Sequence, residues 1–507
     1  MKTRFFFAAM AALAIISCNK EADVVTPTLE GPAAMLKVNI KSAAQTKAYS
    51  DGIAEENAVK TVDFYFYDAA GAAYSVVPGS NSIKWTAKDP ANDNIAAVSD
   101  VVLVIKQAEQ TPPAKVVAIL NDATDYSGLT LEELGEQVIT ALHTGKTNFV
   151  MSNSVYYDEA KNKTVVVASD ITQDNIFVDT KYEGEAGATY TGEVAVTPID
   201  VYVERVAAKV TVNFGAENLV PVKDAQGNQM KDSEGKPVYV DFTGWNVTNA
   251  TDEANLIKSL NASYDFAWTW NNPADFRSFW ANTTDTPEHK HTFTALEAHT
   301  DAFDYYFENT SAEASQLLVA ARLCDAEGAK ISLAKWYNVL YTVADAKLAV
   351  LNTIATKVYV AGTEAGTYVS AGVDDVVFYQ REYTAADNRY EVLVAAKEGV
   401  TYYKADGTVY TDVAEVFEAI LPIQMWEEGM TYYYTTINHI DAAAPAIVRN
   451  HEYQITVSGV KGFGTPVYDP DQIIIPEPVD PQDALNLAAQ INVLSWNVVS
   501  QDVTLGF

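Results

Sequence analysis

Residues 491–507 read INVLSWNVVSQDVTLGF, and this stretch decides how the rest of the chain is interpreted. Apolar side chains alternate along it, first at Ile491 and Val493, then at Trp496 and Val498 after a shift of one residue. Such alternation is typical of a half-buried strand, and the shift indicates a bulge or a bend. A proline-rich stretch precedes it. We therefore expect a strand on a spacer that has no partner in its own fold and needs a sheet edge elsewhere.

The opposite end of the chain has the pattern of an export signal. Lys2 and Arg4 precede the apolar residues 5–16, and Ser17 precedes Cys18. Residues 15–18 (IISC) resemble the bacterial lipobox, in which the cysteine carries palmitate-type lipid chains. The sequence predicts a lipoprotein signal peptide over residues 1–17, lipidation at Cys18 and membrane contact through the lipid alone. An ordinary signal peptide with an accidental cysteine is the alternative.

Composition favours an exported all-β protein. The net charge of −33 makes nucleic acid and anionic membrane surfaces poor partners. The chain has twenty-nine tyrosines, a residue that is common in exposed strands. It also has little long helical periodicity, so the two observations together indicate an all-β body. Once Cys18 is lipidated, Cys324 has no cysteine partner, so we expect no internal disulfide and a small, buried, apolar role for Cys324.

Local patterns predict short strands separated by turns. The first is residues 36–40 (LKVNI), followed by a polar stretch, SAAQTKAYSDG, in which a protease can reach the backbone. Thr130 opens a capping box and a short amphipathic helix through Leu142. The run VYVERVAAKVTVNF at residues 201–214 is one long strand-like segment, and its central charges, Glu204 and Arg205, suggest that it passes between two domains.

In the second half, residues 336–341 read as one strand, and residues 376–379 and 390–395 as two more. Asp406-Gly407 predicts a hairpin turn, and residues 411–420 predict a short helix.

Catalytic chemistry is not indicated. No HExxH, G-x-S-x-G, P-loop or dinucleotide fingerprint occurs, so we predict no catalytic residue, no cofactor and no enzyme activity. His289, His291 and His299 could hold zinc, but a solvated loop accounts for them more simply, so we predict no metal site. Trp268, Trp270 and Trp280 could stack sugars or pack beneath a long loop.

Several stretches together resemble the fimbrillins of the Bacteroidales, and most closely the major stalk subunits of the Mfa/FimA type. They are the lipobox, VYVERVAAKVTV in mid-chain, YFENTS at residues 306–311, IVRNHEYQITVSGVKGFGTPV at residues 447–467 and VLSW at residues 493–496. The resemblance covers nearly the whole chain through the order and spacing of these pieces.

The resemblance implies two transthyretin-like β-sandwich domains with a few short helices and a C-terminal donor strand. The implied boundaries are a signal peptide at 1–17, a tether and removable first strand at 18–47, an N-terminal sandwich at 48–203, a C-terminal sandwich at 204–468 and a linker with the donor strand at 469–507. The resemblance also implies that the precursor is exported as a lipoprotein to the outer membrane surface, that a protease removes its first strand, and that a neighbour's C-terminal strand fills the groove in an extracellular fimbrium.

Carried onto this sequence, the resemblance places cleavage between Lys47 and Ala48, where the best-known members are cut after arginine. The implied donor residues are Ile491, Val493, Leu494, Trp496, Val498, Val503 and Leu505. We expect Trp496 to be the side chain that holds the strand in its groove; packing of Trp496 on its own domain is the alternative. The partners are identical subunits head-to-tail, accessory anchor and tip pilins, and a surface receptor that the sequence does not name.

The sequence is also compatible with three other functions. The chain could be the anchor subunit, which keeps its lipid and an uncleaved Lys47–Ala48 bond. It could instead be a surface lipoprotein that captures glycans as a monomer. A glycosidase or peptidase is the remaining alternative, because carboxylates that meet only in space are invisible in a sequence.

Overall fold

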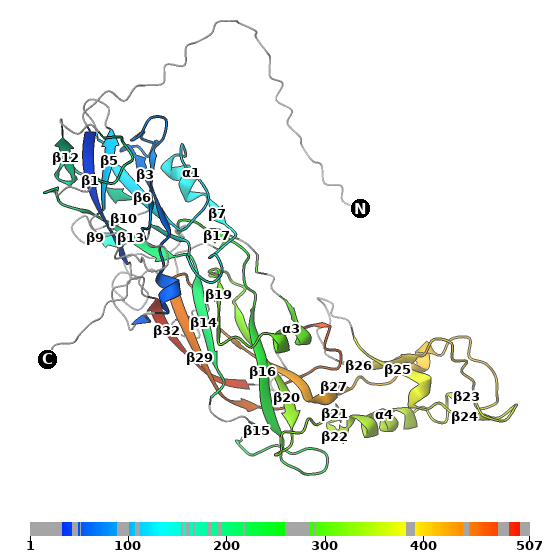
Figure 1. Cartoon of the computed structure of the whole chain (residues 1–507). Helices are drawn as coiled ribbons and strands as arrows, with labels where there is room; N and C mark the ends of the chain where they lie inside the picture. The colour runs from blue at the N-terminus through cyan, green and yellow to red at the C-terminus, as the bar shows by residue number, and fades with distance from the viewer. Residues whose placement is uncertain are drawn as a thin grey trace, which may run out of the picture.

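The structure is a computed structural model, and it describes part of the chain. The described residues are 33–42, 49–50, 52–88, 101–106, 112–153, 156–158, 163–165, 168–179, 184–190, 194–215, 219–258, 283–284, 286–287, 290–381, 391–439, 446–474 and 486–496. Within them the chain is built mostly from strands with a few short helices, which confirms the all-β class (Figure 1). None of the helices described is long and apolar enough to cross a membrane.

The first large sheet forms the N-terminal sandwich, at upper left in Figure 1. Its strands run in the order β12-β1-β13-β8-β6-β3-β4, with β5 on β1 and β11 on β6. Their bounds are β1 Ala33–Ser42, β3 Thr61–Tyr67, β4 Ser82–Thr86, β5 Val101–Lys106, β6 Lys115–Leu120, β8 Met151–Asn153, β11 Ser169–Asp170, β12 Ile176–Asp179 and β13 Ile199–Arg205. An apolar core fills this sandwich, and it includes nearly every residue of β3 and β6.

The second large sheet forms the C-terminal sandwich. Its order is β19-β14-β29-β15-β16-β20-β28-β30, and β32 pairs with both β29 and β2. The bounds are β2 Tyr49–Ser50, β14 Ala208–Asn213, β15 Val220–Lys223, β16 Tyr239–Thr248, β19 Phe303–Tyr306, β20 Gln316–Cys324, β28 Met430–Thr436, β29 His451–Lys461, β30 Thr465–Pro466 and β32 Asn486–Trp496. Cys324 is buried at the end of β20, as expected.

Smaller elements accompany the two large sheets. Three two-stranded pairs are described outside residues 333–423: β7 Val138–Ile139 with β17 Ala254–Asn255, β9 Tyr156–Asp158 with β10 Lys163–Val165, and β18 His291–Thr292 with β31 Ile473–Ile474. The helical segments described outside residues 333–423 are α1 Leu131–Gly135, α3 Phe293–Ala298 and the 3₁₀ turns η1 Ala54–Asn57, η3 Gln173–Asn175 and η5 Glu427–Gly429.

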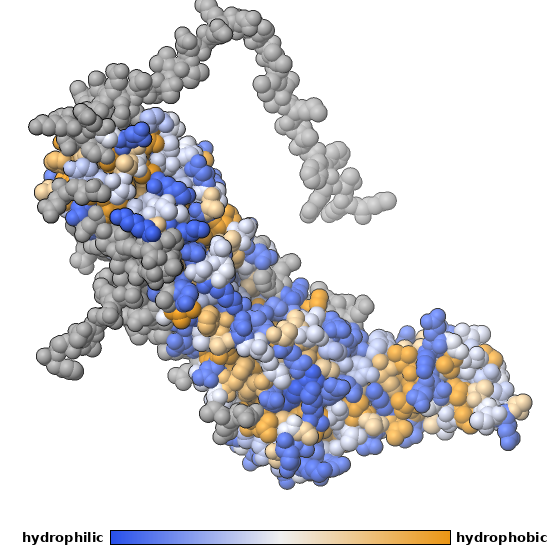
Figure 2. Space-filling view, in the orientation of Figure 1, coloured by the Kyte–Doolittle hydropathy of each residue, from blue (hydrophilic) through white to orange (hydrophobic). Residues whose placement is uncertain are grey.

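A third packed unit lies between β20 and β28, which are neighbours in the C-terminal sheet. We call residues 333–423 the arm, because they project away from the sandwiches at lower right in Figure 1. Its elements, which β27 Gln424–Trp426 joins to the body, are β21 Leu333–Trp336, β22 Val339–Thr342, α4 Val343–Asn352, β23 Tyr359–Ala361, β24 Tyr368–Ser370, η4 Val373–Asp375, β25 Val376–Gln380, β26 Val392–Ala396 and α5 Ala414–Glu418. It has its own apolar core, which the expectation of two sandwiches alone did not include, and apolar residues also lie on its surface (Figure 2).

Several predicted elements are present and others differ. Thr130 caps α1 with a capping box, α5 lies within the predicted helix, and Gly407 takes the positive φ that the predicted turn requires. The helix at Thr130 is shorter than predicted, however, because the chain after Gly135 becomes β7 and pairs with the distant β17.

The predicted single strand at residues 336–341 is wrong. Tyr337 and Asn338 have φ values of 50° and 59°, so they form a tight turn between β21 and β22. The long run at residues 201–214 is likewise two strands: β13 ends in one sheet at Arg205, and β14 begins in the other at Ala208.

Candidate assembly site

The predicted removable strand is an interior strand of the N-terminal sandwich. Residues 33–38 of β1 pair antiparallel with β5 along one edge. Along the other edge, residues 33–36 pair with β12 and residues 38–42 pair in parallel with β13. β1 is therefore hydrogen-bonded on both sides, which makes it an integral part of the sheet and not an appended edge.

One face of β1 lies in the apolar core. Ala34, Leu36, Val38 and Ile40 alternate along the strand, and none is more than 2% exposed. This is the period-2 pattern expected of a strand with one buried face. Taking β1 away would leave an apolar groove with unpaired backbone groups on both of its walls.

The segment after β1 contains the predicted cleavage bond. Lys47 and Ala48 lie outside the described residues, as does the predicted lipidation site Cys18. The chain is described again at β2, where Tyr49 and Ser50 pair in parallel with Ser495 and Trp496 of β32. The residues on the C-terminal side of the predicted bond thus lie beside the predicted donor strand.

The C-terminal strand does have a partner in its own chain, which corrects the expectation that it has none. β32 pairs antiparallel with β29 from His451↔Ser495 to Lys461↔Asn486. It begins five residues before the predicted start at Ile491, and the register shift lies opposite Ala488 and Ala489. The sequence pattern missed this partner because pairing with β29 is decided by a sheet edge distant in sequence.

The predicted donor residues are partly placed. Ile491, Val493, Leu494 and Trp496 lie in β32, whereas Val498, Val503 and Leu505 lie outside the described residues. Ile491 stands opposite Ile455, and Val493 stands opposite Tyr453. Among the described strands, β32 has β29 along one edge and only the short β2 on the other.

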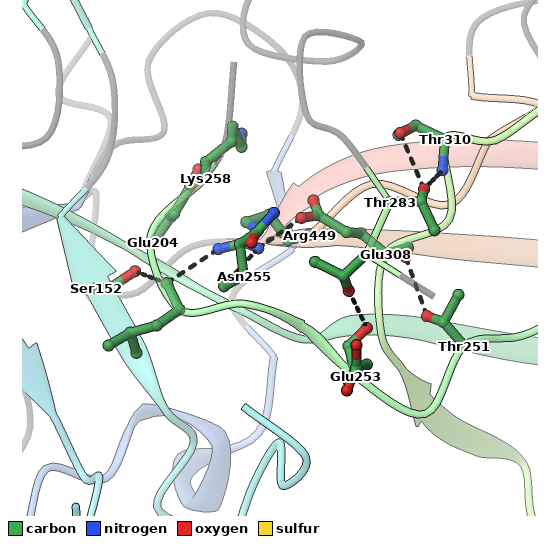
Figure 3. A network of polar contacts seen from close by, with 12 residues as sticks. Ser152, Glu204, Thr251, Glu253, Asn255, Lys258, Thr283, Glu308, Thr310 and Arg449 are labelled. Carbon is green, nitrogen blue, oxygen red and sulfur yellow. Dashed lines mark hydrogen bonds and ion pairs between the residues drawn. The ribbon is translucent and has the colours of Figure 1, made fainter. Parts of the chain in front are cut away.

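A buried polar network joins the two sandwiches near this strand. The segment that contains β17 inserts into the N-terminal core, with Ala254, Leu256 and Ile257 buried there. Arg449, which is fully buried just before β29, donates to the carbonyls of Asn255 at 2.6 Å and Leu256 at 3.3 Å (Figure 3). It also forms an ion pair with the buried Glu308 at 2.5 Å. This arginine therefore fixes the inserted segment to the C-terminal sandwich.

A second group of charges lies around Glu56. Its carboxylate accepts from Lys209 at 2.8 Å and from the Tyr305 hydroxyl at 2.6 Å. Arg205 donates to the Glu56 carbonyl at 3.1 Å and to the side chain of Asn57. Burial lowers the pKa of Arg205 to about 9, against the attraction of Glu56, and burial followed by the bond to Glu56 raises the pKa of Tyr305. η1 is thus attached to both sandwiches directly after β2.

Glu204 and Arg205, the two charges that the sequence analysis singled out, are both buried at this junction. Glu204 lies 3.2 Å from Lys258, and both side chains are at most 4% exposed. In the sequence, the only signal for the junction was the pair of charges at Glu204 and Arg205. Nothing local identified Glu56, Glu308 or Arg449, because their partners are far away along the chain.

The histidines do not form a zinc site in the described part of the chain. His291 Nε2 lies 2.9 Å from the carbonyl of Val247, and His299 Nε2 lies 3.1 Å from Asp304. His289 and the three tryptophans of the predicted sugar loop lie outside the described residues. Among those described, no group of three metal-ligating side chains comes together.

The comparison with protein families gives one match. Residues 424–502 match the family described as major fimbrial subunit protein type IV, fimbrillin, C-terminal. By this match, residues 424–502 resemble the C-terminal region of fimbrillins. The matched region begins at β27, includes β28, β29 and β32, and starts where the arm ends.

The comparison with solved structures gives fimbrial proteins among its matches, all at low identity and with TM-scores below 0.5. A fimbrilin from Porphyromonas gingivalis W83 is 12% identical, with a TM-score of 0.40 over 92% of this chain and 98% of that one. The tip fimbrial protein Mfa3 from Porphyromonas gingivalis is 13% identical, with a TM-score of 0.31 over 92% and 100%. A fimbrial assembly protein from Parabacteroides distasonis is 9% identical, with a TM-score of 0.30 over 75% and 98%. The curated proteins give no match.

Proposed function

We propose that this protein is a fimbrillin and the stalk subunit of a surface fimbrium that serves adhesion, and that it polymerises head-to-tail by donating its C-terminal strand after cleavage between Lys47 and Ala48. The observation that carries the proposal is the position of β1, an interior strand that directly precedes the proposed cleavage bond. β32, at 11 residues, is long enough to replace β1, at 10 residues.

The pairing of the two strands gives the exchange its direction. In its own chain, β32 is paired along one edge with β29, and on its other edge only two residues contact β2. In the position of β1, a strand is paired along both edges and buries one apolar face. Backbone bonds lost at β29 are replaced in the groove, and each buried polar group otherwise left unpaired there costs about 1–3 kcal/mol. The exchange therefore favours the groove.

Cleavage acts on both halves of this exchange. It separates β1 from the body, which allows the groove to empty. It also releases β2 from the chain that precedes it, and β2 is the short strand on the outer edge of β32. Lipidation at Cys18 serves export and surface delivery before cleavage, so the mature subunit has no lipid. The contact is head-to-tail and does not close, which gives a filament.

The decisive experiment compares the full chain with a truncation that lacks residues 486–507. We expect surface material run unboiled on an SDS gel to give a high-mass ladder whose subunits begin at Ala48, and we expect the ladder to be absent from the truncation. A single band that keeps lipidated Cys18, equal in both strains, would contradict the stalk role and indicate the anchor. A monomer that binds glycans without polymerising would indicate the surface lipoprotein.

A further inference from the structure

The β25–β26 pair of the arm has an apolar face on each side, and one of them is open to solvent. The inner face, with Val376, Val392 and Val394, packs in the arm core. On the outer face Val377 and Tyr379 are 40% and 42% exposed. Their cross-strand partners are Ala395 and Leu393, so the outer face is apolar throughout these two rows. The outer face of a surface hairpin is normally polar, which makes this open face a candidate contact surface.

The strand that carries this open face also holds the start of the donor's tether. Gln380, the last residue of β25, is 5% exposed, and its Oε1 accepts from the backbone N–H groups of Tyr468 and Asp469 at 3.1 and 2.9 Å. Gln472 donates back to the carbonyl of Gln380 at 3.3 Å. Lys347 lies over the rings of Phe378 and Tyr468, each at 5.2 Å. The segment that leads to β32 therefore contacts the arm at the end of β25, on the inner face of this strand.

The receiving side of the proposed joint has exposed apolar residues as well. β12 flanks the first half of β1, and its Phe177 and Val178 are 39% and 43% exposed. Outside the arm, few large apolar side chains of the described residues are exposed to this degree. Among the described strands, β12 pairs only with β1 and stands last in the order of its sheet. An apolar surface thus lies next to the groove that the donor strand enters.

The length of the tether brings the two surfaces into range. Residues 475–485 reach about 37 Å when fully extended, and they start three residues after Gln472, which contacts Gln380 of the arm. We propose that the outer β25–β26 face docks on β12 of a second copy of this chain, the copy that receives its C-terminal strand. This inference rests on the proposed strand donation and adds a second contact between the same two subunits.

The chemistry of the face favours a protein surface over a glycan. Valine, tyrosine, leucine and alanine offer apolar area, whereas sugar sites need several converging polar groups. Two copies of a chain with a net charge of −33 repel each other, so an apolar contact suits this pair better than a charged one. The contact can be small, because the donated strand holds the partner at a high effective concentration.

The test is site-specific cross-linking in filaments that have already formed. A Tyr379→p-benzoylphenylalanine variant reacts on illumination with what lies next to it. Tyr337, which is 65% exposed on the same arm, serves as the matched position. We expect the Tyr379 probe to join neighbouring subunits at peptides from residues 168–190, which include β12, and the Tyr337 probe to give about fivefold less product.

The outcomes separate this inference from the function on which it rests. Filaments that form normally but give no product at Tyr379, or give product on the C-terminal sandwich or on another protein, overturn the inference alone. No strand-dependent filament from the unmodified chain overturns both. As a second measurement, a V377T/Y379N variant should lengthen filaments about fivefold more slowly than a Y337N/V339T variant. Equal rates contradict the contact.

Discussion

The Oε1 atom of Glu56 lies 2.8 Å from the Nζ atom of Lys209, and both side chains are buried. Glu56 belongs to η1, which follows β2, and Lys209 belongs to β14, an inner strand of the C-terminal sandwich. This ion pair therefore holds the chain that follows the proposed cleavage bond against the body, whichever strand occupies the groove.

Replacing Glu56 with glutamine should strongly destabilise the protein. The change removes the negative charge nearest to the buried ammonium of Lys209, and Glu452 lies farther away, at 3.9 Å. Removal of one partner of a buried ion pair costs about 3–5 kcal/mol. Urea unfolding of the E56Q precursor should show the loss, and the exposed neighbour provides the control as E55Q. Equal midpoints for the two variants would contradict a structural role for the pair.

The pair formed by Arg449 and Glu308 should behave non-additively. R449M alone leaves the buried carboxylate of Glu308 without its cation, whereas R449M/E308L removes both charges. We expect the double variant to be about 1–3 kcal/mol more stable than R449M, although the carbonyls of Asn255 and Leu256 still lose a donor. Thermal or urea unfolding measures this, and a double variant less stable than R449M would sink the interpretation.

Gln380 should control the start of the tether. In Q380A the N–H groups of Tyr468 and Asp469 lose their acceptor, at a cost of about 1–3 kcal/mol for each buried group left unpaired. Hydrogen exchange at these two amides should accelerate in Q380A and stay slow in Q380E, which keeps an acceptor oxygen at the same place. Unchanged exchange in Q380A would mean that Gln380 does not hold the segment.

Two histidines should give opposite pH dependences. The hydrogen bond to Asp304 raises the pKa of His299 above its ordinary 6.5. Burial acts to raise the pKa of Asp304, but the bond from His299 brings it below its ordinary 3.8. The contribution of His299 is complete below about pH 6.5 and is lost as the pH rises through its folded pKa, and that of Asp304 is lost as the pH falls through its own. The interaction between His299 and Asp304 thus makes its full contribution to stability between about pH 3.8 and pH 6.5.

The measurement is the unfolding free energy of the protein minus that of H299Q, which should shrink as the pH rises from 6 to 9. Burial lowers the pKa of His143 instead, so H143Q serves as a control of opposite sign. Its unfolded state binds more protons, and its contribution therefore rises with pH near neutrality. The same trend for both variants would contradict the assignment.

A subunit that is cut at the proposed bond and lacks residues 486–507 should accept a peptide in place of β1. Addition of a peptide with the sequence of residues 486–507 should raise the melting temperature, since it binds the folded state. The same peptide with Val493→Asp should raise it less, because a carboxylate cannot enter an apolar groove without a large cost. No stabilisation by either peptide would count against strand donation.

Local sequence patterns predicted the elements that local interactions determine. The capping box at Thr130 and the turn at Asp406-Gly407 need only neighbours a few residues away, and both are present. The turn at Tyr337 and Asn338 was missed because no glycine marks its positive φ values. Several strands and one helix of the arm were predicted individually, but the arm as a unit was missed because its core joins segments that lie far apart along the chain.

For the candidate site, the sequence predicted a first strand and a terminal strand, and the structure has a strand at both places. It did not predict that β1 is interior or that β32 lies on β29, since sheet order depends on pairing between distant segments. The buried partners of Glu56 and Arg449 are equally non-local, with separations of 153 and 141 residues to Lys209 and Glu308.

In the proposed exchange, the C-terminal strand moves from the edge of β29 to the place of β1, and these two positions differ in mechanical strength. A strand on the edge of β29 can be peeled away from one end, so that its bonds break one after another under a small force. A strand in the position of β1 is bonded on both sides to β5, β12 and β13. A pull along its axis loads all of these bonds in shear at once, and rupture then requires many to fail together. In the proposed exchange, the same segment would thus be easy to release from a single subunit and hard to withdraw from a filament under tension.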